Sequence, residues 1–190
     1  MTSLNNYALI NKTGKFDLGY IDLFYDELCI PRQYSTTNVL EIGVYKGDSV
    51  KLWRDFFINA TVYGIDILDL SFLRQEERII PIDYTNAYIL STLDLLKNLE
   101  PNGFDIIIDD GPHTFESMVF FLSYYQYLLK PKGLLILEDI INTEWTMPLA
   151  NQLSSISGSI FILDATSKIK SEELKVQWKK GLDVIIFEKY

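Results

Sequence analysis

Two apolar runs that each end in acidic residues constrain the fold of this chain most strongly. Residues 104–108 read F-D-I-I-I and are followed by D-D-G-P-H, while residues 134–137 read L-L-I-L and are followed by E-D. Short runs rich in β-branched residues are typical of parallel strands that are covered on both faces. Because residues 114–130 between the runs have a helical pattern, the sequence predicts a β-α-β unit whose two strands run in the same direction.

The acids that follow these strands predict a functional edge of the sheet. In an open α/β sheet the ligand crevice lies outside the carboxyl ends of the strands. We therefore expect a cluster of four acids and the single histidine of the chain, namely Asp109, Asp110, Glu138, Asp139 and His113. Carboxylate oxygens suit hard divalent ions, and a histidine can act as a base near neutral pH. The residues alone leave a structural alternative open, in which the acids are solvated or cap a helix and the histidine is a structural hydrogen-bond partner.

Alternating strand and helix patterns extend this unit over most of the chain. Strands are predicted at residues 38–44, 62–67, 78–82, 104–109, 133–138, 159–163 and 183–188, and helices at 18–29, 50–58 and 114–130. This alternation predicts an α/β fold with a parallel sheet. Charged residues 164–182 separate the last two strands, which could pair as a hairpin at one sheet edge. We expect a single domain over residues 1–190, with residues 1–37 forming an N-terminal helical segment that packs on the sheet.

Composition excludes several classes of partner. The 190 residues are 48% hydrophobic, which fits one globular core, and the net charge of −9 with scattered basic residues disfavours nucleic-acid binding. Cys29 is the only cysteine and cannot form an internal disulfide, and the first six residues lack a basic segment followed by an apolar one. No apolar run reaches the roughly 18 residues of a membrane span. We expect a cytoplasmic protein with neither a nucleic-acid nor a membrane partner.

The loop after the first predicted strand indicates a nucleoside site. Residues 41–49 read E-I-G-V-Y-K-G-D-S, and Gly43 and Gly47 would let a ligand approach the backbone closely. Asp66 follows the next strand, about 20 residues on, where an acid suits ribose hydroxyls. The loop lacks G-x-G-x-x-G spacing and Glu41 would repel a phosphate, which disfavours NAD and favours a cationic ligand portion such as an α-amino group. Alternatively, these are ordinary strand-end acids and turn glycines.

These motifs together resemble a known family. The pattern E-x-G-x-x-x-G followed by an acid resembles the cofactor motifs of class I S-adenosylmethionine-dependent methyltransferases. The combination of V-L-E-I-G (39–43), L-W-R-D-F-F (52–57), V-Y-G-I-D-I (62–67), F-D-I-I-I-D-D-G-x-H (104–113) and L-E-D (137–139) is similar to the metal-dependent sugar O-methyltransferases of macrolide and related pathways, and to their cephalosporin-hydroxylase-like relatives. The resemblance implies a Rossmann-like, seven-stranded, mostly parallel sheet with helices on both faces.

The resemblance also implies where S-adenosylmethionine would bind. Glu41, Gly43 and Gly47 would line the amino-acid part of the cofactor, and Asp66 would hold the ribose. Asp83 would face the adenine, and Asp109 would also belong to the cofactor site. Residues 11–17, N-K-T-G-K-F-D, only partly resemble the N-terminal motif of the family.

The same resemblance implies a metal ion and a reaction. Asp110, Glu138 and Asp139 would bind Mg²⁺, and His113 with Asp110 would be catalytic, His113 as the base. The expected function is Mg²⁺-dependent O-methylation of a hydroxyl on a sugar or glycosylated small molecule, by a chain that could be a homo-oligomer. A 2-His-1-carboxylate iron site is excluded by the single histidine. The alternative is an S-adenosylmethionine-binding module or partner subunit without catalysis.

Overall fold

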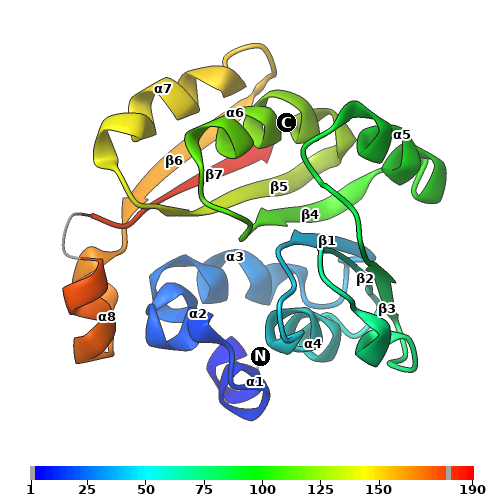
Figure 1. The fold of residues 1–190 in the computed structure, drawn as a ribbon, viewed down its shortest axis with the longest axis horizontal. Helices are drawn as coiled ribbons and strands as arrows, with labels where there is room; N and C mark the ends of the chain where they lie inside the picture. Colours follow the sequence, from blue (N-terminus) through cyan, green and yellow to red (C-terminus); the bar gives the residue numbers. More distant parts are fainter. Residues whose placement is uncertain (1–2, 179–180) are drawn as a thin grey trace.

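One twisted sheet forms the centre of the molecule. A computed structural model describes residues 3–178 and 181–190, and its strands follow the order β3-β2-β1-β4-β5-β7-β6 (Figure 1). The strands are β1 (Asn38–Ile42), β2 (Thr61–Ile65), β3 (Ile79–Ile82), β4 (Phe104–Asp109), β5 (Leu129–Ile140), β6 (Gly158–Asp164) and β7 (Asp183–Lys189). The first five are mutually parallel, whereas β7 is antiparallel to both β5 and β6. The seven-stranded, mostly parallel sheet and the edge hairpin predicted from the sequence are confirmed.

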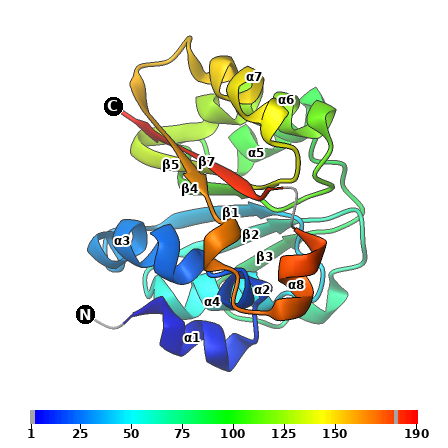
Figure 2. The same cartoon turned by 90° about the vertical axis from the view of Figure 1, so that its left-hand side faces the viewer.

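Helices cover both faces of this sheet. Figures 1 and 2 show α5, α6 and α7 on one face, and α1 to α4 with α8 on the other. The α-helices are α1 (Leu4–Asn11), α2 (Gly14–Asp17), α3 (Asp26–Cys29), α4 (Asp48–Phe56), α5 (Leu90–Leu99), α6 (Phe115–Tyr124), α7 (Thr146–Ala150) and α8 (Glu172–Gln177). A π-helical turn, η1 (Ile21–Tyr25), precedes α3, and short 3₁₀ turns are η2 (Ile30–Arg32), η3 (Ser71–Leu73), η4 (Tyr125–Leu128), η5 (Thr143–Trp145), η6 (Asn151–Leu153) and η7 (Thr166–Lys168). Among the described helices, none is both long enough and apolar enough to cross a bilayer.

The apolar runs of the sequence supply two cores, one on each face. In β4, Ile106 and Ile108 point into the core beneath α4, while Ile107 points into the core beneath α6. Successive side chains of a strand point to opposite faces, so an unbroken apolar run fills both layers. Burying the strands in this way fixes their carboxyl ends at one edge, where the acids emerge.

All three predicted helices differ in their bounds from the structure. The predicted helix 50–58 begins and ends two residues earlier, as α4, and the other two differ more. The predicted helix 114–130 ends as α6 at Tyr124 and continues as a 3₁₀ turn, and Leu129 already pairs with β4. Pro131 explains this, because the residue before a proline favours extended backbone. The predicted helix 18–29 is interrupted at Gly19, whose φ of 77° is left-handed, so the helical turns start only after it.

Candidate active site

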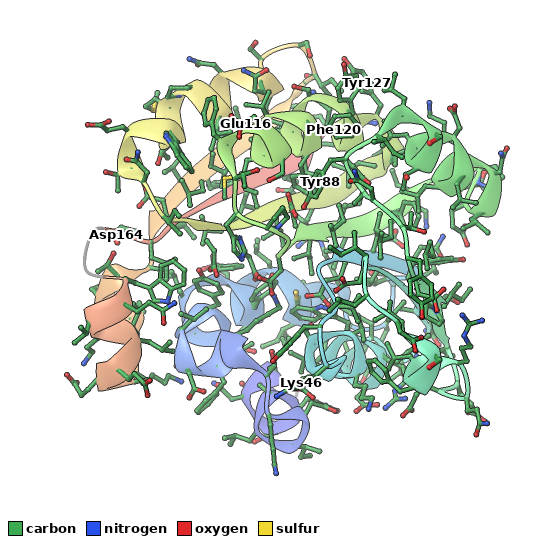
Figure 3. All side chains as sticks on the ribbon, in the orientation of Figure 1. Lys46, Tyr88, Glu116, Phe120, Tyr127 and Asp164 are labelled. Carbon is green, nitrogen blue, oxygen red and sulfur yellow. The ribbon has the colours of Figure 1, made fainter. Side chains whose placement is uncertain are left out.

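A cavity of about 1050 Å³ opens at the carboxyl ends of β1, β2 and β4. The glycine loop after β1, the end of β2, the segment before α5, the loop after β4, and α2 surround it. Figure 3 shows Lys46 on one side of the sheet and Tyr88, Glu116 and Phe120 on the other, and all four residues line the cavity. The pocket therefore lies where the strand ends of an α/β sheet place a ligand site.

The glycine loop is held by close contact with β4 and by Asp66. Gly43 has φ 86°, and a Cβ there would lie 2.0 Å from the carbonyl oxygen of Asp110, so only glycine fits. Asp66 Oδ2 accepts the backbone N–H groups of Val44 and Tyr45 at 2.8 and 2.9 Å. Gly43 and Asp66 both line the pocket. The structure thus gives Asp66 a role in shaping the loop, and its contact with a ribose stays a prediction.

Glu41 lies beneath the pocket instead of lining it. Its side chain is fully buried, and Oε2 accepts hydrogen bonds from Ser49 Oγ at 2.7 Å and Trp53 Nε1 at 3.2 Å. Lys15 Nζ lies 3.2 Å from Oε1. Burial raises the pKa of Glu41, and Lys15 opposes that rise. A direct contact between Glu41 and the amino group of a cofactor stays a prediction.

The other predicted cofactor residues also lie outside the pocket lining. Gly47 precedes α4 with φ 81°, and Asp83 forms an ion pair with Arg74. Asp109 is buried and accepts a hydrogen bond from Tyr88 Oη at 2.6 Å. Burial raises the pKa of Asp109 to about 7, although this hydrogen bond opposes the shift. Asp109 thereby orients Tyr88, which does line the pocket.

Asp110, which follows β4, and Asp139, near the carboxyl end of β5, lie close to His113. One ligand atom each from Asp110, His113 and Asp139 lies within 4.8 Å of the other two. His113 Nε2 is 3.8 Å from Asp110 Oδ1 and 3.7 Å from Asp139 Oδ2. His113 and Asp139 have φ of 53° and 56°, a left-handed conformation that is uncommon for non-glycine residues and tends to cluster at functional sites. Asp110 also lines the pocket, so the cluster adjoins it.

Glu138, the third predicted metal ligand, has both oxygens engaged by protein groups. Lys15 Nζ donates to Oε2 and Tyr25 Oη donates to Oε1. Asp139 is half engaged, because Tyr20 Oη donates to Oδ1 while Oδ2 faces His113. Burial raises the pKa of Glu138 and of Asp139, and neighbouring carboxylates raise both further.

Lys15 is a residue of the candidate site that the sequence did not single out. It extends from α2, is 3% exposed, and pairs with Asp110 at 2.8 Å as well as with Glu41 and Glu138. Burial lowers the pKa of Lys15, but the surrounding carboxylates outweigh this effect and raise it. Among the described side chains, four clustered carboxylates, Glu41, Asp110, Glu138 and Asp139, thus face one buried ammonium.

A cluster of carboxylates that outnumbers its cations fits a divalent ion. Asp110 Oδ1 and Asp139 Oδ2 face His113, and oxygen donors of this kind are the ligands that Mg²⁺ prefers. Asp110 is 31% exposed and lines the pocket, and His113, between the lining residues Pro112 and Thr114, is 25% exposed. The residues present therefore fit the predicted metal, with Asp110 and Asp139 as ligands available without rearrangement.

Fold and pocket together define a class of protein. A glycine loop after β1, an acid after β2 and the strand order 3-2-1-4-5-7-6 are the features of the Rossmann-like methyltransferase fold. The chain belongs to the family described as methyltransferase domain, whose model matches residues 40–140. The resemblance to class I methyltransferases predicted from the sequence is confirmed.

The curated relatives that the chain matches are named O-methyltransferases. The chain is 30% identical over 149 residues to the 8-demethyl-8-alpha-L-rhamnosyl tetracenomycin-C 2'-O-methyltransferase of Streptomyces olivaceus, a match over 75% of this chain and 39% of that protein. It is 32% identical over 145 residues to the mycinamicin VI 2''-O-methyltransferase of Micromonospora griseorubida, over 70% of this chain and 35% of that protein. The chain spans less than half the length of the curated relatives it matches.

Solved structures agree with these matches. The MycE methyltransferase of the mycinamycin pathway, in complex with Mg and SAH, is 29% identical with a TM-score of 0.63, over 73% of this chain and 37% of that chain. A further MycE structure, which also contains mycinamycin VI, matches the fold over 99% of this chain and 54% of that chain, with 23% identity and a TM-score of 0.67.

Proposed function

We propose that this chain is an S-adenosylmethionine-dependent, Mg²⁺-dependent O-methyltransferase that acts on a hydroxyl of a sugar or glycosylated small molecule. The observation that carries the proposal is the junction of the pocket with the acidic cluster, where Asp110 belongs to both. The names of the matched relatives and the Mg and SAH in the MycE complex support the reaction class and the metal.

The chain supplies groups for each part of the reaction. The cavity of about 1050 Å³ is large for a small-molecule site, since such sites measure roughly 300–1,000 Å³, and it could hold cofactor and acceptor together. Gly43 lets a ligand approach the loop backbone, and Asp66 holds that loop in place. Bound S-adenosylmethionine supplies a methyl group on a positively charged sulfur.

Asp110, Asp139 and His113 would together remove the proton of the acceptor hydroxyl. Asp110 and Asp139 would hold Mg²⁺, which when bound lowers the pKa of an acceptor hydroxyl. His113 Nε2 lies 3.7–3.8 Å from both carboxylates and is positioned to accept the hydroxyl proton. Positioning the acceptor oxygen in line with the methyl group contributes much of the acceleration in such transfers.

Labelled S-adenosylmethionine tests this proposal directly. The protein is incubated with a panel of glycosylated metabolites, with Mg²⁺ or with EDTA, and transfer of label is measured. We expect transfer to at least one glycoside that stops in EDTA and returns with Mg²⁺ or Mn²⁺. Full turnover in metal-free buffer would contradict the metal, and failure of calorimetry to detect S-adenosylhomocysteine binding would contradict the cofactor.

A cofactor-binding module without catalysis is the second candidate. The observation that favours it is the engagement of both Glu138 oxygens by Lys15 and Tyr25, which leaves two carboxylates for a metal. Such a module would bind S-adenosylhomocysteine and transfer no label to any glycoside.

Cytoplasmic location and homo-oligomer formation also stay predictions.

A further inference from the structure

The Lys15 ammonium lies inside the candidate metal site. Its Nζ is 2.8 Å from Asp110 Oδ2 and also donates to Glu138 Oε2, so it occupies oxygens of two of the three carboxylates predicted to bind Mg²⁺. Asp110 and Glu138 lie 95 and 123 residues away in the sequence, at the ends of β4 and β5. One side chain from α2 thereby closes the cluster from the N-terminal side.

A third carboxylate lies close to the ammonium. Glu41 Oε1 is 3.2 Å from Lys15 Nζ and has no hydrogen-bond donor, while Oε2 is held by Ser49 and Trp53. A buried ammonium without a carboxylate partner would strongly destabilise the folded protein. Because Glu41 is already within ion-pair distance, Lys15 can leave Glu138 and remain paired.

We propose that Lys15 is a tethered competitor for the divalent ion, which binds all three carboxylates only when the ammonium is displaced toward Glu41. The inference rests on the proposed Mg²⁺ site. Two cations a few ångströms apart repel strongly in a buried, low-dielectric cluster. Lys15 therefore lowers the affinity of the site for divalent ions and preserves charge balance at Glu138 when no ion is bound.

Mn²⁺ binding to the whole chain, followed by the electron paramagnetic resonance signal of free Mn²⁺, measures this competition without turnover. Lys15→Met removes the charge and keeps most of the side-chain volume. We expect it to bind Mn²⁺ about tenfold or more tightly than the wild type, because repulsion is removed and Glu138 is released. Equal or weaker binding by Lys15→Met would overturn the proposal.

Lys46→Met is the matched control. Lys46 also lines the pocket, and its described contact is with the Tyr45 ring, 5.1 Å from the ring centroid, instead of the clustered carboxylates (Figure 3). We expect its Mn²⁺ affinity to stay within about twofold of the wild type, since the charge it removes is exposed and screened by solvent. A gain equal to that of Lys15→Met would show a general charge effect and overturn the specific role of Lys15.

Loss of the buried cation could prevent folding of Lys15→Met. In that case Lys15→Met/Glu41→Gln, which removes one positive and one negative charge, is compared with Glu41→Gln alone. The double variant is expected to bind Mn²⁺ more tightly than Glu41→Gln, and the reverse order would contradict the competition.

Calorimetry with S-adenosylhomocysteine on the same proteins separates this inference from the proposed function. Binding of S-adenosylhomocysteine with no Mn²⁺ binding in any variant would overturn the competition and leave the cofactor assignment intact. Tighter Mn²⁺ binding by Lys15→Met without S-adenosylhomocysteine binding would support the competition and contradict the methyltransferase proposal.

Discussion

At the residue scale, the oxygens of each acid in the cluster have separate partners. Asp110 directs one oxygen to Lys15 and the other to His113. Asp139 divides its oxygens between Tyr20 and His113. The partner on one oxygen fixes the orientation of the carboxylate, and the other oxygen faces the imidazole. Orientation of ligands by such outer partners is a general feature of metal sites.

His113→Asn tests the proposed base. Asparagine tolerates the left-handed backbone that His113 adopts at φ 53°, so this variant removes the imidazole with less backbone strain than alanine would cause. Loss of a general base typically lowers kcat by about 10²–10⁴-fold. We expect this loss with S-adenosylhomocysteine affinity unchanged, measured on the acceptor found in the glycoside panel. A kcat close to that of the wild type from about pH 6 to pH 9 would make His113 structural.

Asp109→Asn tests the neutral state of a buried carboxyl. The pKa of Asp109 is raised from 3.8 to about 7 by burial, so the folded protein holds a proton that the unfolded chain releases. Stability therefore falls as pH rises from about 4 to 7, by up to about 4 kcal/mol for a shift of roughly three units. Asn keeps an acceptor for Tyr88, and its stability relative to the wild type should increase over this window in urea unfolding.

Asp105→Asn, in the same strand, is a control of opposite sign. Burial raises the pKa of Asp105, but hydrogen bonds from Thr37, Lys130 and Asn38 outweigh this effect and lower it. A depressed folded pKa contributes stability above the unfolded pKa that is lost as pH falls. Asp105→Asn should therefore be most destabilising near neutral pH and less so in acid.

The prediction for Asp109 would be contradicted by parallel stability–pH profiles of the wild type and Asp109→Asn, which would show that Asp109 is ionised when folded.

At the element scale, the ends of β1 and β4 meet at a single glycine. Gly43→Ala would place a Cβ 2.0 Å from the Asp110 carbonyl oxygen and hold a non-glycine residue at φ 86°. Left-handed backbone alone costs roughly 1–2 kcal/mol, and the clash adds to it. We expect lower stability and weaker S-adenosylhomocysteine binding, measured by urea unfolding and calorimetry.

Gly14→Ala, in α2, is the control for that substitution. A Cβ at Gly14 would meet no atom within 4 Å, so stability should be unchanged or slightly higher. A Gly43→Ala protein as stable as Gly14→Ala would contradict the contact between the two loops.

The elements differ in how far the sequence predicts them. Apolar periodicity is local, so it predicts β4, β5 and the acids at their carboxyl ends. The contact of Lys15 with Glu138 joins residues 123 apart, and no local pattern carries it. Tyr20 and Tyr25 are five residues apart. In an α-helix this spacing would place the two side chains on different faces, whereas the π-helical turn brings them closer to the same face. The charged and aromatic side chains of residues 11–25 are the sequence feature that could have indicated Lys15, Tyr20 and Tyr25 as site residues.

At the scale of the whole molecule, the acids of the site and the N-terminal helices form one unit. The parallel strands bring Glu41, Asp110 and Glu138 to the same edge, and the burial of Glu41 and Glu138 beside a third carboxylate would be unfavourable without a cation. Lys15 supplies that cation from a segment that precedes the whole sheet in the chain. Packing of the N-terminal helices and charge balance of the site are therefore linked, and cofactor or metal binding should be detectable in the stability of the entire fold.

S-adenosylhomocysteine should stabilise the fold by mass action. At a ligand concentration of 100 times Kd, the free energy of unfolding rises by about 2.7 kcal/mol. Asp66→Ala removes the acceptor for the Val44 and Tyr45 N–H groups and should bind the ligand more weakly, so the same concentration should stabilise it less. Asp69→Ala, an exposed acid that lies outside the pocket lining, should respond like the wild type. Thermal unfolding with and without ligand measures all three proteins, and an unchanged midpoint in the wild type, or equal gains in wild type and Asp66→Ala, would contradict the placement of the cofactor.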